Sequence, residues 1–594
     1  MNCVRRHKTV GIAVLLLWAG GCTSRPAPST KPATGDNRDD GVATALARLE
    51  RDNDPETCRD VLAALDAITQ PRESRPDPSP AEIKQYAAML KLTPAQAEGF
   101  ASPTFTNADG DYLADCFILR DAIESLEIGK LPPRDQAVQA FDWVCRQVYL
   151  TRQSTAPAPA WWLLQAGMGT GLDRTYLFLG MLQQLNLQGY LIGPPELAQS
   201  PAFNQNALVA RQNPFPPIRT VGVQIGNEVL LFDPRKGEAV GGPDMILTLS
   251  AIRSDPSRAK EWLTAAKIPD DEVKRWQLFV AAPIQSFQPR TAWLQRQLTA
   301  TATVALAVDL RGVIEKTGRD LLSQPALAGM QCLLWNPAND PWSLVNIVTT
   351  FSMEARNDQA SPGNVQKAKY MFDHFPWQFL PRLSVDGAPL SGEPQRIVGR
   401  LFESEFKQTM FATNSPRDNL VRGNFSSAIA ALTEVKDRNQ RIRDVVTRTK
   451  ITTADVEEWS KAANNIFAAV LAAEESGDAA ALHKAMAKQS SFVLTPQSEK
   501  IALLIRRQTS TLLNAQADYE LAMILHERAV RALLRWKLKP DNATRTEAER
   551  LLSSAIDGWQ RYLDNHPELR EEFADRDQHA RSLQKQARAT LAKR

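Results

Sequence analysis

A glycine-rich turn precedes a strongly apolar segment near residue 170. The turn reads Gly167-Met168-Gly169-Thr170-Gly171, and residues 172–185 follow it with helical spacing. A thiol at the start of such a helix has a lowered pKa, because the helix dipole and the unpaired N–H groups favour the thiolate. Further along, Asp233 ends the apolar run 229–232, and a carboxylate can orient a histidine ring for acyl transfer. Nucleophilic chemistry of this kind would need a thiol and a histidine at positions near the turn.

The reactive groups themselves are missing from these positions. Residue 171 is glycine, and its neighbours Thr170 and Leu172 supply no thiol. The histidines of the chain are His7, His374, His483, His526, His566 and His579. An aspartate alone cannot perform acyl transfer, because the reaction needs a nucleophile and a base. Residues 167–233 therefore contain neither a thiol nor a histidine.

Two other residues offer ways to restore the chemistry. Cys145 is a thiol upstream of the turn, but it shares an apolar helical stripe with Phe141, Val144 and Val148, and this spacing predicts a buried side chain. His374 could arrive from a later part of the chain, yet without a thiol it has nothing to activate. We therefore favour the non-catalytic interpretation over both.

Ligand chemistry of other kinds has weaker support. Glycines before a helix can cradle a phosphate, but the dinucleotide-binding pattern needs a glycine where Leu172 stands, and no Walker-type lysine follows. Asp109, Asp111 and Asp115 lie close together in a glycine-containing stretch, yet the calcium-loop series ending in glutamate is incomplete, so we expect a solvated turn. We predict no metal site and no cofactor.

The segment 137–237 resembles the transglutaminase-like family, which shares the papain-type core. That family shows a helix of the form A-x-x-x-F-x-W-V, and residues 137–144 read AVQAFDWV. Next comes a glycine-rich turn that carries the nucleophilic cysteine at the start of an apolar helix. A strand later ends in Asp-Pro, and residues 229–234 read VLLFDP. The resemblance covers roughly a sixth of the chain.

The resemblance implies a role for particular positions. It puts the nucleophile at Gly171, the histidine near residues 219–221 and the carboxylate at Asp233, so the first two reactive groups are replaced. This departure from the family's pattern predicts a domain without catalytic activity. In the family, a cleft beside these groups seats an extended peptide. The residues of this chain that would line it are Trp161, Trp162, Asp173, Arg174 and Asp233. A protein or peptide partner is implied; alternatively, the two tryptophans form the core of the domain.

The N-terminus carries a second motif. A basic head with Arg5, Arg6 and Lys8 precedes the apolar run 10–18, and small residues then lead into Cys22. The run is too short to span a membrane and indicates a secretory signal. It resembles the lipobox of bacterial lipoproteins, which implies cleavage before Cys22 and a lipid on that cysteine that anchors the chain to a membrane. The alternative is a plain secretory signal in which Cys22 is incidental.

The same resemblance bears on location. Lipoproteins retained at the inner membrane commonly carry aspartate after the lipidated cysteine, and here residue 23 is threonine. The expected location is thus the cell envelope, facing the periplasm, with the outer membrane favoured over the inner. The mature chain would keep Cys58, Cys116, Cys145 and Cys332. These are too few for a disulfide scaffold, so we expect buried free thiols for most of them.

Composition narrows the class of protein. The chain has 594 residues, of which 43% are hydrophobic and 23% charged, and a formal net charge of +3. This length predicts several domains. So small a net charge does not build the strong basic face that nucleic-acid binding needs, so we expect no nucleic-acid partner.

The order of segments predicts an α+β protein, with a papain-like or transglutaminase-like domain followed by a mostly α-helical C-terminal region. Short strands are expected at 190–192, 221–225 and 229–232, and one more within 299–309. Residues 549–567 resemble the second helix of a tetratricopeptide repeat. The predicted segments are a signal peptide (1–21), the lipidated cysteine and a flexible tether (22–40), an N-terminal helical region (41–130), the transglutaminase-like domain (131–285), a mixed connecting region (286–396) and a helical bundle or tetratricopeptide-like repeats (397–594).

Three functional interpretations follow. The first is a membrane-anchored lipoprotein whose non-catalytic transglutaminase-like domain acts as a binding or scaffolding module in the cell envelope. The second is an active cysteine peptidase or acyltransferase of the same superfamily. The third is an envelope structural protein unrelated to that fold.

Overall fold

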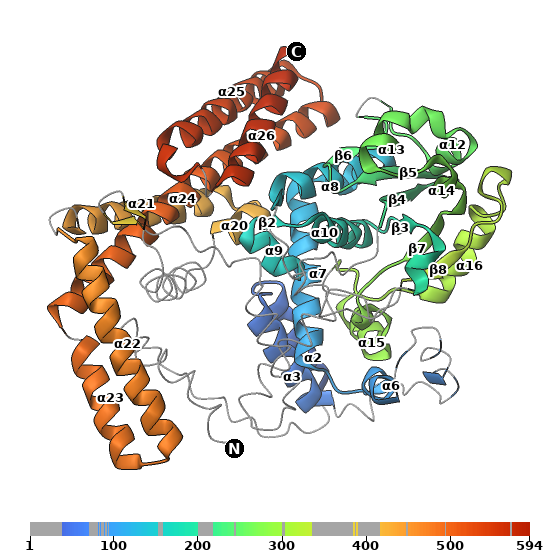
Figure 1. Cartoon of the computed structure of the whole chain (residues 1–594). Helices are drawn as coiled ribbons and strands as arrows, with labels where there is room; N and C mark the ends of the chain where they lie inside the picture. Colours follow the sequence, from blue (N-terminus) through green and yellow to red (C-terminus); the bar gives the residue numbers. More distant parts are fainter. Residues whose placement is uncertain are drawn as a thin grey trace. The chain divides into compact units, whose positions relative to one another are not determined.

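The computed structural model describes most of the chain in two compact units (Figure 1). The described residues are 38–69, 94–151, 159–199, 218–335 and 416–593, with short gaps in the last two ranges, and a few residues elsewhere. We call the described residues up to 335, together with Arg417–Asn424, the α+β unit. Residues from Phe425 onward form the helical unit. The predicted signal peptide, Cys22 and His374 lie outside the described residues.

The α+β unit begins with a group of helices. Its first members are α2 (Arg38–Leu49), α3 (Pro55–Thr69), α6 (Pro94–Ala101) and α7 (Asn107–Leu126). Helix α7 begins at residue 107, because Thr106 and Asp109 form a capping box there. The solvated turn expected around Asp109 and Asp111 is therefore wrong, since both residues lie in the first turns of this helix.

The helices predicted around Cys145 and after the glycine-rich turn are both present. They are α8 (Pro133–Gln147) and α10 (Gly171–Gln184). Between them the chain forms β1 (Tyr149–Leu150), α9 (Ala160–Ala166) and β2 (Met168–Gly169), and β1 pairs with β2 in parallel. Helix α10 begins in a capping box, in which the Thr170 hydroxyl accepts from the N–H of Asp173. The glycine-rich turn thus leads directly into α10.

A six-stranded mixed sheet forms the centre of this unit, in the order β6-β5-β4-β3-β7-β8. The strands are β3 (Gly189–Gly193), β4 (Thr220–Ile225), β5 (Glu228–Asp233), β6 (Glu238–Ala239), β7 (Gln277–Val280) and β8 (Cys332–Leu334). All neighbours are antiparallel except β7 and β8. The three predicted strands are confirmed as β3, β4 and β5, and Gly226-Asn227 makes the tight turn between the last two.

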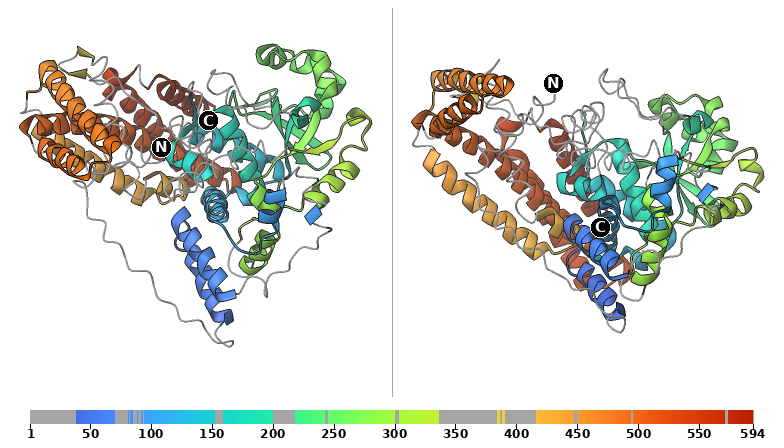
Figure 2. Two further views of the ribbon diagram at one scale, coloured as in Figure 1. Left: turned by 60° about the horizontal axis from the view of Figure 1, so that its bottom comes forward. Right: turned by 90° about the horizontal axis from the view of Figure 1, so that it is seen from below.

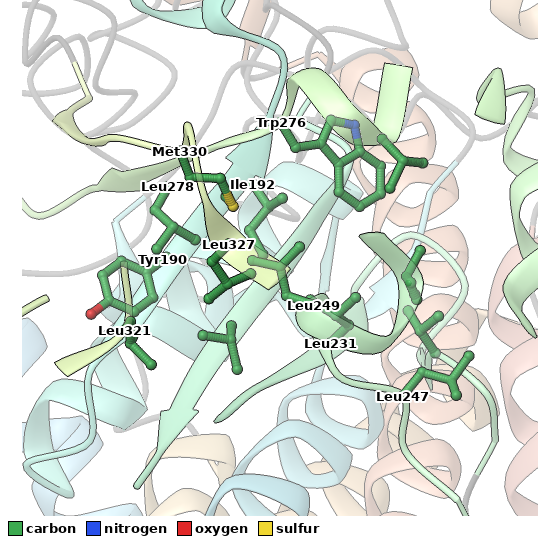
Figure 3. Packing of buried hydrophobic residues seen from close by; sticks show 14 of the residues in the cluster. Tyr190, Ile192, Leu231, Leu247, Leu249, Trp276, Leu278, Leu321, Leu327 and Met330 are labelled. Carbon is green, nitrogen blue, oxygen red and sulfur yellow. The ribbon is translucent and has the colours of Figure 1, made fainter. Parts of the chain in front are cut away.

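The two faces of the sheet bury different side chains. Phe232 of β5 points to one face, where its ring lies 5.0 Å from that of Phe141 in α8 and 5.3 Å from that of Phe178 in α10. Leu231, next to it, points to the opposite face. There it joins a cluster with Tyr190 and Ile192 (Figure 3). Helices therefore cover both faces.

The second face is covered by segments that follow β5 in the sequence. They include α12 (Leu249–Ser254), α13 (Lys260–Ala266), α14 (Asp270–Arg275) and α16 (Leu310–Asp320). The cluster in Figure 3 also takes in Leu321, Leu327 and Met330. The body built on the sheet therefore continues past residue 285 to at least β8, within the stretch predicted as a connecting region.

The strand expected within 299–309 is not formed by the described residues 303–309. Side-chain amides bind this backbone instead of a neighbouring strand. The amide of Gln295, in α15 (Pro289–Leu298), accepts from the N–H of Leu306 and donates to the carbonyl of Val304. Gln184 of α10 does the same for both backbone groups of Ala305. These bonds satisfy the backbone without a strand.

The helical unit confirms the helical C-terminal region. Its helices are α21 (Phe425–Val446), α22 (Thr453–Ser476), α23 (Ala479–Val493), α24 (Pro496–Leu538), α25 (Asn542–Asn565) and α26 (Ala574–Ala592). Helix α24 has 43 residues and is therefore about 65 Å long. Helix α25 packs closely along it, because Gly558 lets the backbone near Ala522 approach. Figure 2 shows these helices from two further sides. None of the helices in the described part of the chain is long and apolar enough to cross a membrane.

Candidate functional site

The start of α10 lies against the residues that follow β5. A Cβ atom at Gly171 would stand 2.6 Å from Cγ of Arg235 and 3.2 Å from its Cα atom. Arg235 in turn donates from Nε to Oδ1 of Asp233, at 3.1 Å. The structure therefore brings together positions 171 and 233, which the sequence singled out, and adds Arg235 between them.

The carboxylate of Asp233 is buried and fully engaged. Its side chain is about 1% exposed, and Oδ1 also accepts from the backbone N–H of Arg235, at 3.0 Å. Oδ2 accepts from the indole N–H of Trp262, at 2.9 Å. An indole and a guanidinium thus hold the carboxylate where the family resemblance would have it hold an imidazole.

The segment where the resemblance expects a histidine carries a second arginine. Arg219 makes a two-pronged ion pair with Glu272, at 2.7 and 2.8 Å. Its carbonyl accepts from Nη2 of Arg235, at 2.6 Å. The next residue, Thr220, donates its hydroxyl proton to the carbonyl of Phe232. These side chains fix the geometry of the hairpin, but none of them is a base suited to activating a thiol.

Asp173 and Arg174 hold the turn in place. Both are buried. Asp173 accepts from the backbone N–H and the hydroxyl of Thr170, at 2.7 and 2.8 Å. Arg174 donates to the carbonyls of Val148 and Cys145. The described bonds of these two side chains do not support the cleft role expected from the sequence; they stabilise the turn.

Trp161 is also tied to a structural partner. Its side chain is half-buried, and its backbone N–H donates to Oδ1 of Asp115, at 2.6 Å. Asp115 therefore caps the start of α9 from the neighbouring helix α7. The side chain of Trp162 lies outside the described residues.

Arg417 is a buried residue at this site that the sequence patterns did not indicate. It lies in α20 (Pro416–Val421), is about 2% exposed, and donates to the carbonyls of Leu164 and Gln147, at 2.5 and 2.6 Å. Gly167, which ends α9 with a φ of +67°, leaves room for it, because a Cβ there would stand 2.7 Å from Nη1 of Arg417. The glycine was a visible signal for a tight turn, but nothing near it pointed to an arginine so distant in the sequence.

The thiols of the described chain lie in environments that oppose ionisation. Burial raises the pKa of Cys145 to about 12 and that of Cys332 to about 11. Burial also raises the pKa of Cys58 and of Cys116. A reactive thiol needs the opposite shift. All four lie in the α+β unit, whereas the described histidines, His483, His526, His566 and His579, lie in the helical unit. Burial of Cys145 therefore disfavours the thiolate that a nucleophile needs.

The acidic residues considered for calcium serve separate purposes. Asp109 pairs with Arg290, at 3.0 Å, with both side chains buried. Asp111 faces Arg59 at 3.4 Å, and burial raises its pKa to about 6. Asp115 caps α9 as described above. Within the described residues, no group of three or more histidine, cysteine, aspartate or glutamate side chains could hold a metal ion.

Comparisons with known proteins add no family to this picture: no family model, no curated protein and no solved structure matches the chain. The fold and the site by themselves define an α+β unit with a mixed sheet, joined in one chain to a helical unit. Its distinguishing local feature is Arg235, which lies between the start of α10 and the end of β5.

Proposed function

We propose that this chain is a lipid-anchored protein of the cell envelope whose transglutaminase-like domain binds or scaffolds a protein or peptide without catalysing a reaction. The proposal has three parts, which are the family likeness, the loss of catalysis and the lipid anchor.

The family likeness is supported by the packing around α10. The N-terminus of this helix meets the end of β5, and its body packs through Phe178 against Phe232. Helix α8, which carries the AVQAFDWV motif, packs on the same face through Phe141. A helix of this kind on an antiparallel β3-β4-β5 arrangement is what the resemblance predicts.

The loss of catalysis is supported by one observation above all. Arg235 takes up the space beside position 171 that a nucleophilic side chain would need, and it neutralises Asp233. A buried carboxylate bonded to a guanidinium and an indole cannot also orient a catalytic imidazole. These contacts therefore support a domain that works without the triad.

The test of catalysis uses the purified protein. We expect no peptidase or transamidase turnover on generic peptide substrates, and no effect of thiol alkylation on any function that the protein performs. Turnover that alkylation abolishes would contradict the proposal. It would favour the alternative, a cysteine peptidase or acyltransferase, with Cys145 as the first residue to replace.

The lipid anchor is supported by the run of small residues that leads into Cys22 after a short apolar segment. Cells grown with labelled fatty acid should incorporate the label into the protein, and Cys22→Ser should abolish the incorporation. Cys3→Ser is the matched control, because Cys3 lies in the segment that is removed. Label that persists in the Cys22→Ser protein would refute the anchor.

The helical unit supports a bundle more than a repeat array. A tetratricopeptide repeat spans 34 residues and contains two helices, whereas α24 alone has 43 residues. We therefore propose a helical bundle that offers surfaces for protein contact. An envelope structural protein unrelated to the family remains the third interpretation, and the activity test does not distinguish it from a binding module. Capture of a defined peptide by the α+β unit would distinguish the two, because it would favour a binding module.

A further inference from the structure

One end of the three helices α24, α25 and α26 is strongly basic. Ala529 of α24, Leu552 of α25 and Ala587 of α26 share one apolar cluster. Helix α25 runs antiparallel to both neighbours, so the C-termini of α24 and α26 lie at the same end as the N-terminus of α25. Figure 1 shows the C-terminus of the chain at this end.

The basic side chains at this end outnumber their acidic partners. Lys537 and Lys539 are exposed at the end of α24, and Arg588 and Lys593 are exposed at the end of α26. Residues 578–594 contain no acidic residue. Among the described residues, Arg588 and Lys593 make no ion pair.

The acidic residues nearby are already engaged. Glu547 pairs with Arg550, at 2.7 Å, and Glu549 pairs with Arg545, at 2.8 Å. Asp541 caps α25 by accepting from the N–H of Thr544. Against these three carboxylates this end carries six basic residues, which are Lys537, Lys539, Arg545, Arg550, Arg588 and Lys593, so its net charge is positive, even though the whole chain has a net charge of only +3.

An exposed apolar side chain lies among these charges. Leu538 is about 41% exposed, and in the described part of the chain it is one of two large hydrophobic side chains with such exposure; the other, Met245, belongs to the α+β unit. Leu538 stands between Lys537 and Lys539, just before Pro540. A single exposed leucine alone requires no explanation. A leucine flanked by two lysines at the end of a bundle has the chemistry of a membrane contact, because the apolar group enters the interface while the cations meet the headgroups.

We propose that Lys537, Leu538, Lys539, Arg588 and Lys593 form a basic tip that docks the helical unit on an anionic phospholipid surface. The contact orients the helical unit against the membrane. This proposal depends on the proposed function only in one respect, which is that an envelope location places a membrane nearby. Binding through the tip does not require the lipid on Cys22, so the two can fail separately.

The test uses the mature chain from Thr23 onward, which lacks the signal segment and the lipidated cysteine. It should co-sediment at low salt with vesicles made of equal parts of phosphatidylglycerol and phosphatidylcholine, and only weakly with phosphatidylcholine alone. Replacing Lys537 and Lys539 by glutamine should lower the affinity on the order of tenfold or more. Leu538→Gln should weaken binding as well, and its effect should persist when salt screens the charges.

A matched control removes the same charge elsewhere in the helical unit. Lys484 and Lys488 are exposed on α23, and replacing both by glutamine should leave vesicle binding unchanged. Equal losses from the two double variants would overturn the proposal, since binding would then depend on total charge. Failure to bind the anionic vesicles would also overturn it. The proposal would also be overturned if the protein bound polyglutamate or nucleic acid as well as it bound vesicles and if Leu538→Gln had no effect. The partner would then be another polyanion.

Discussion

Cγ of Arg235 lies 2.6 Å from the place where a Cβ atom at Gly171 would stand. The same side chain donates to Asp233 and to the carbonyl of Arg219, so it cannot withdraw without losing these bonds. Gly171 does not have a positive φ, and the need for glycine here comes from this contact and not from backbone strain. The arginine in this place requires a glycine at the start of α10.

A methyl group at position 171 tests this relationship. Gly171→Ala should lower the free energy of unfolding by about 1–3 kcal/mol, because it overpacks a filled site. Gly318→Ala is the matched control: Gly318 lies in helix α16 with nothing within 4 Å of its Cβ position. That variant should gain about 0.5–1 kcal/mol from helix propensity. Urea unfolding measures both.

Arg235→Ala provides the complementary test. In that background Gly171→Ala should cost much less, since the obstructing side chain is gone, and a double-mutant cycle would show the coupling directly. If Gly171→Ala is as well tolerated as Gly318→Ala in the native protein, Arg235 does not fill the nucleophile position. The proposed loss of catalytic activity would then lack its main structural support.

Asp115 makes the stability of the α+β unit depend on pH. Burial raises its pKa from 3.8 to about 8, so the folded state binds a proton that the unfolded state has lost. The contribution of Asp115 to stability should therefore be full below about pH 4, fall as pH rises to about 8, and level off above. Asp111, whose pKa is raised to about 6, acts in the same direction.

The measurement is urea unfolding at about pH 5, pH 7 and pH 9. Asp115→Asn should remove most of the decline across these three pH values, while keeping an oxygen that accepts from Trp161. Asp255→Asn, at an exposed carboxylate, is the control. A decline that is the same in all three proteins would show that Asp115 is not its source.

Arg417 should be essential for the stability of the glycine-rich turn. Arg417→Met keeps the aliphatic stem but leaves the carbonyls of Leu164 and Gln147 without their donor. We expect a loss of about 2–4 kcal/mol, since an unsatisfied buried polar group costs ~1–3 kcal/mol. Arg311→Met, at an exposed position in α16, should change little. Hydrogen exchange of residues 163–171 should accelerate only in the first variant, and unchanged exchange there would contradict this role.

The thiols should react slowly and in a defined order. Cys145 and Cys332 are half-buried, whereas Cys58 and Cys116 are buried, and burial raises the pKa of all four. We expect native alkylation at neutral pH to be slower than in the urea-unfolded protein by orders of magnitude, with Cys332 modified before Cys58 and Cys116. Mass spectrometry of the alkylated peptides reports the order. Rapid native labelling of Cys145 would indicate an activated thiol and would revive the enzyme interpretation.

The local patterns of the sequence determined much of the α+β unit. Apolar spacing predicted α8 and α10, and the short apolar runs at 221–225 and 229–232 predicted the strands β4 and β5. Such features depend on residues within one or two turns of each other, so periodicity and turn chemistry suffice to predict them. The absence of cysteine at position 171 and of histidine at positions 219–221 was likewise visible in the sequence alone.

The tertiary structure decided what replaces the missing groups and what holds the site. Arg235 against Gly171, Glu272 on Arg219 and Arg417 behind Gly167 are pairings between segments far apart in the chain. No local sequence pattern predicts these pairings, because a guanidinium can donate to any carbonyl or carboxylate that the tertiary fold brings close to it. The parallel partner β8 and the amide-bound segment near residue 305 have the same origin. From the sequence, Asp173 and Arg174 were expected to line a cleft, but both are buried in the fold. Burial depends on neighbours from distant parts of the chain, which local patterns do not predict.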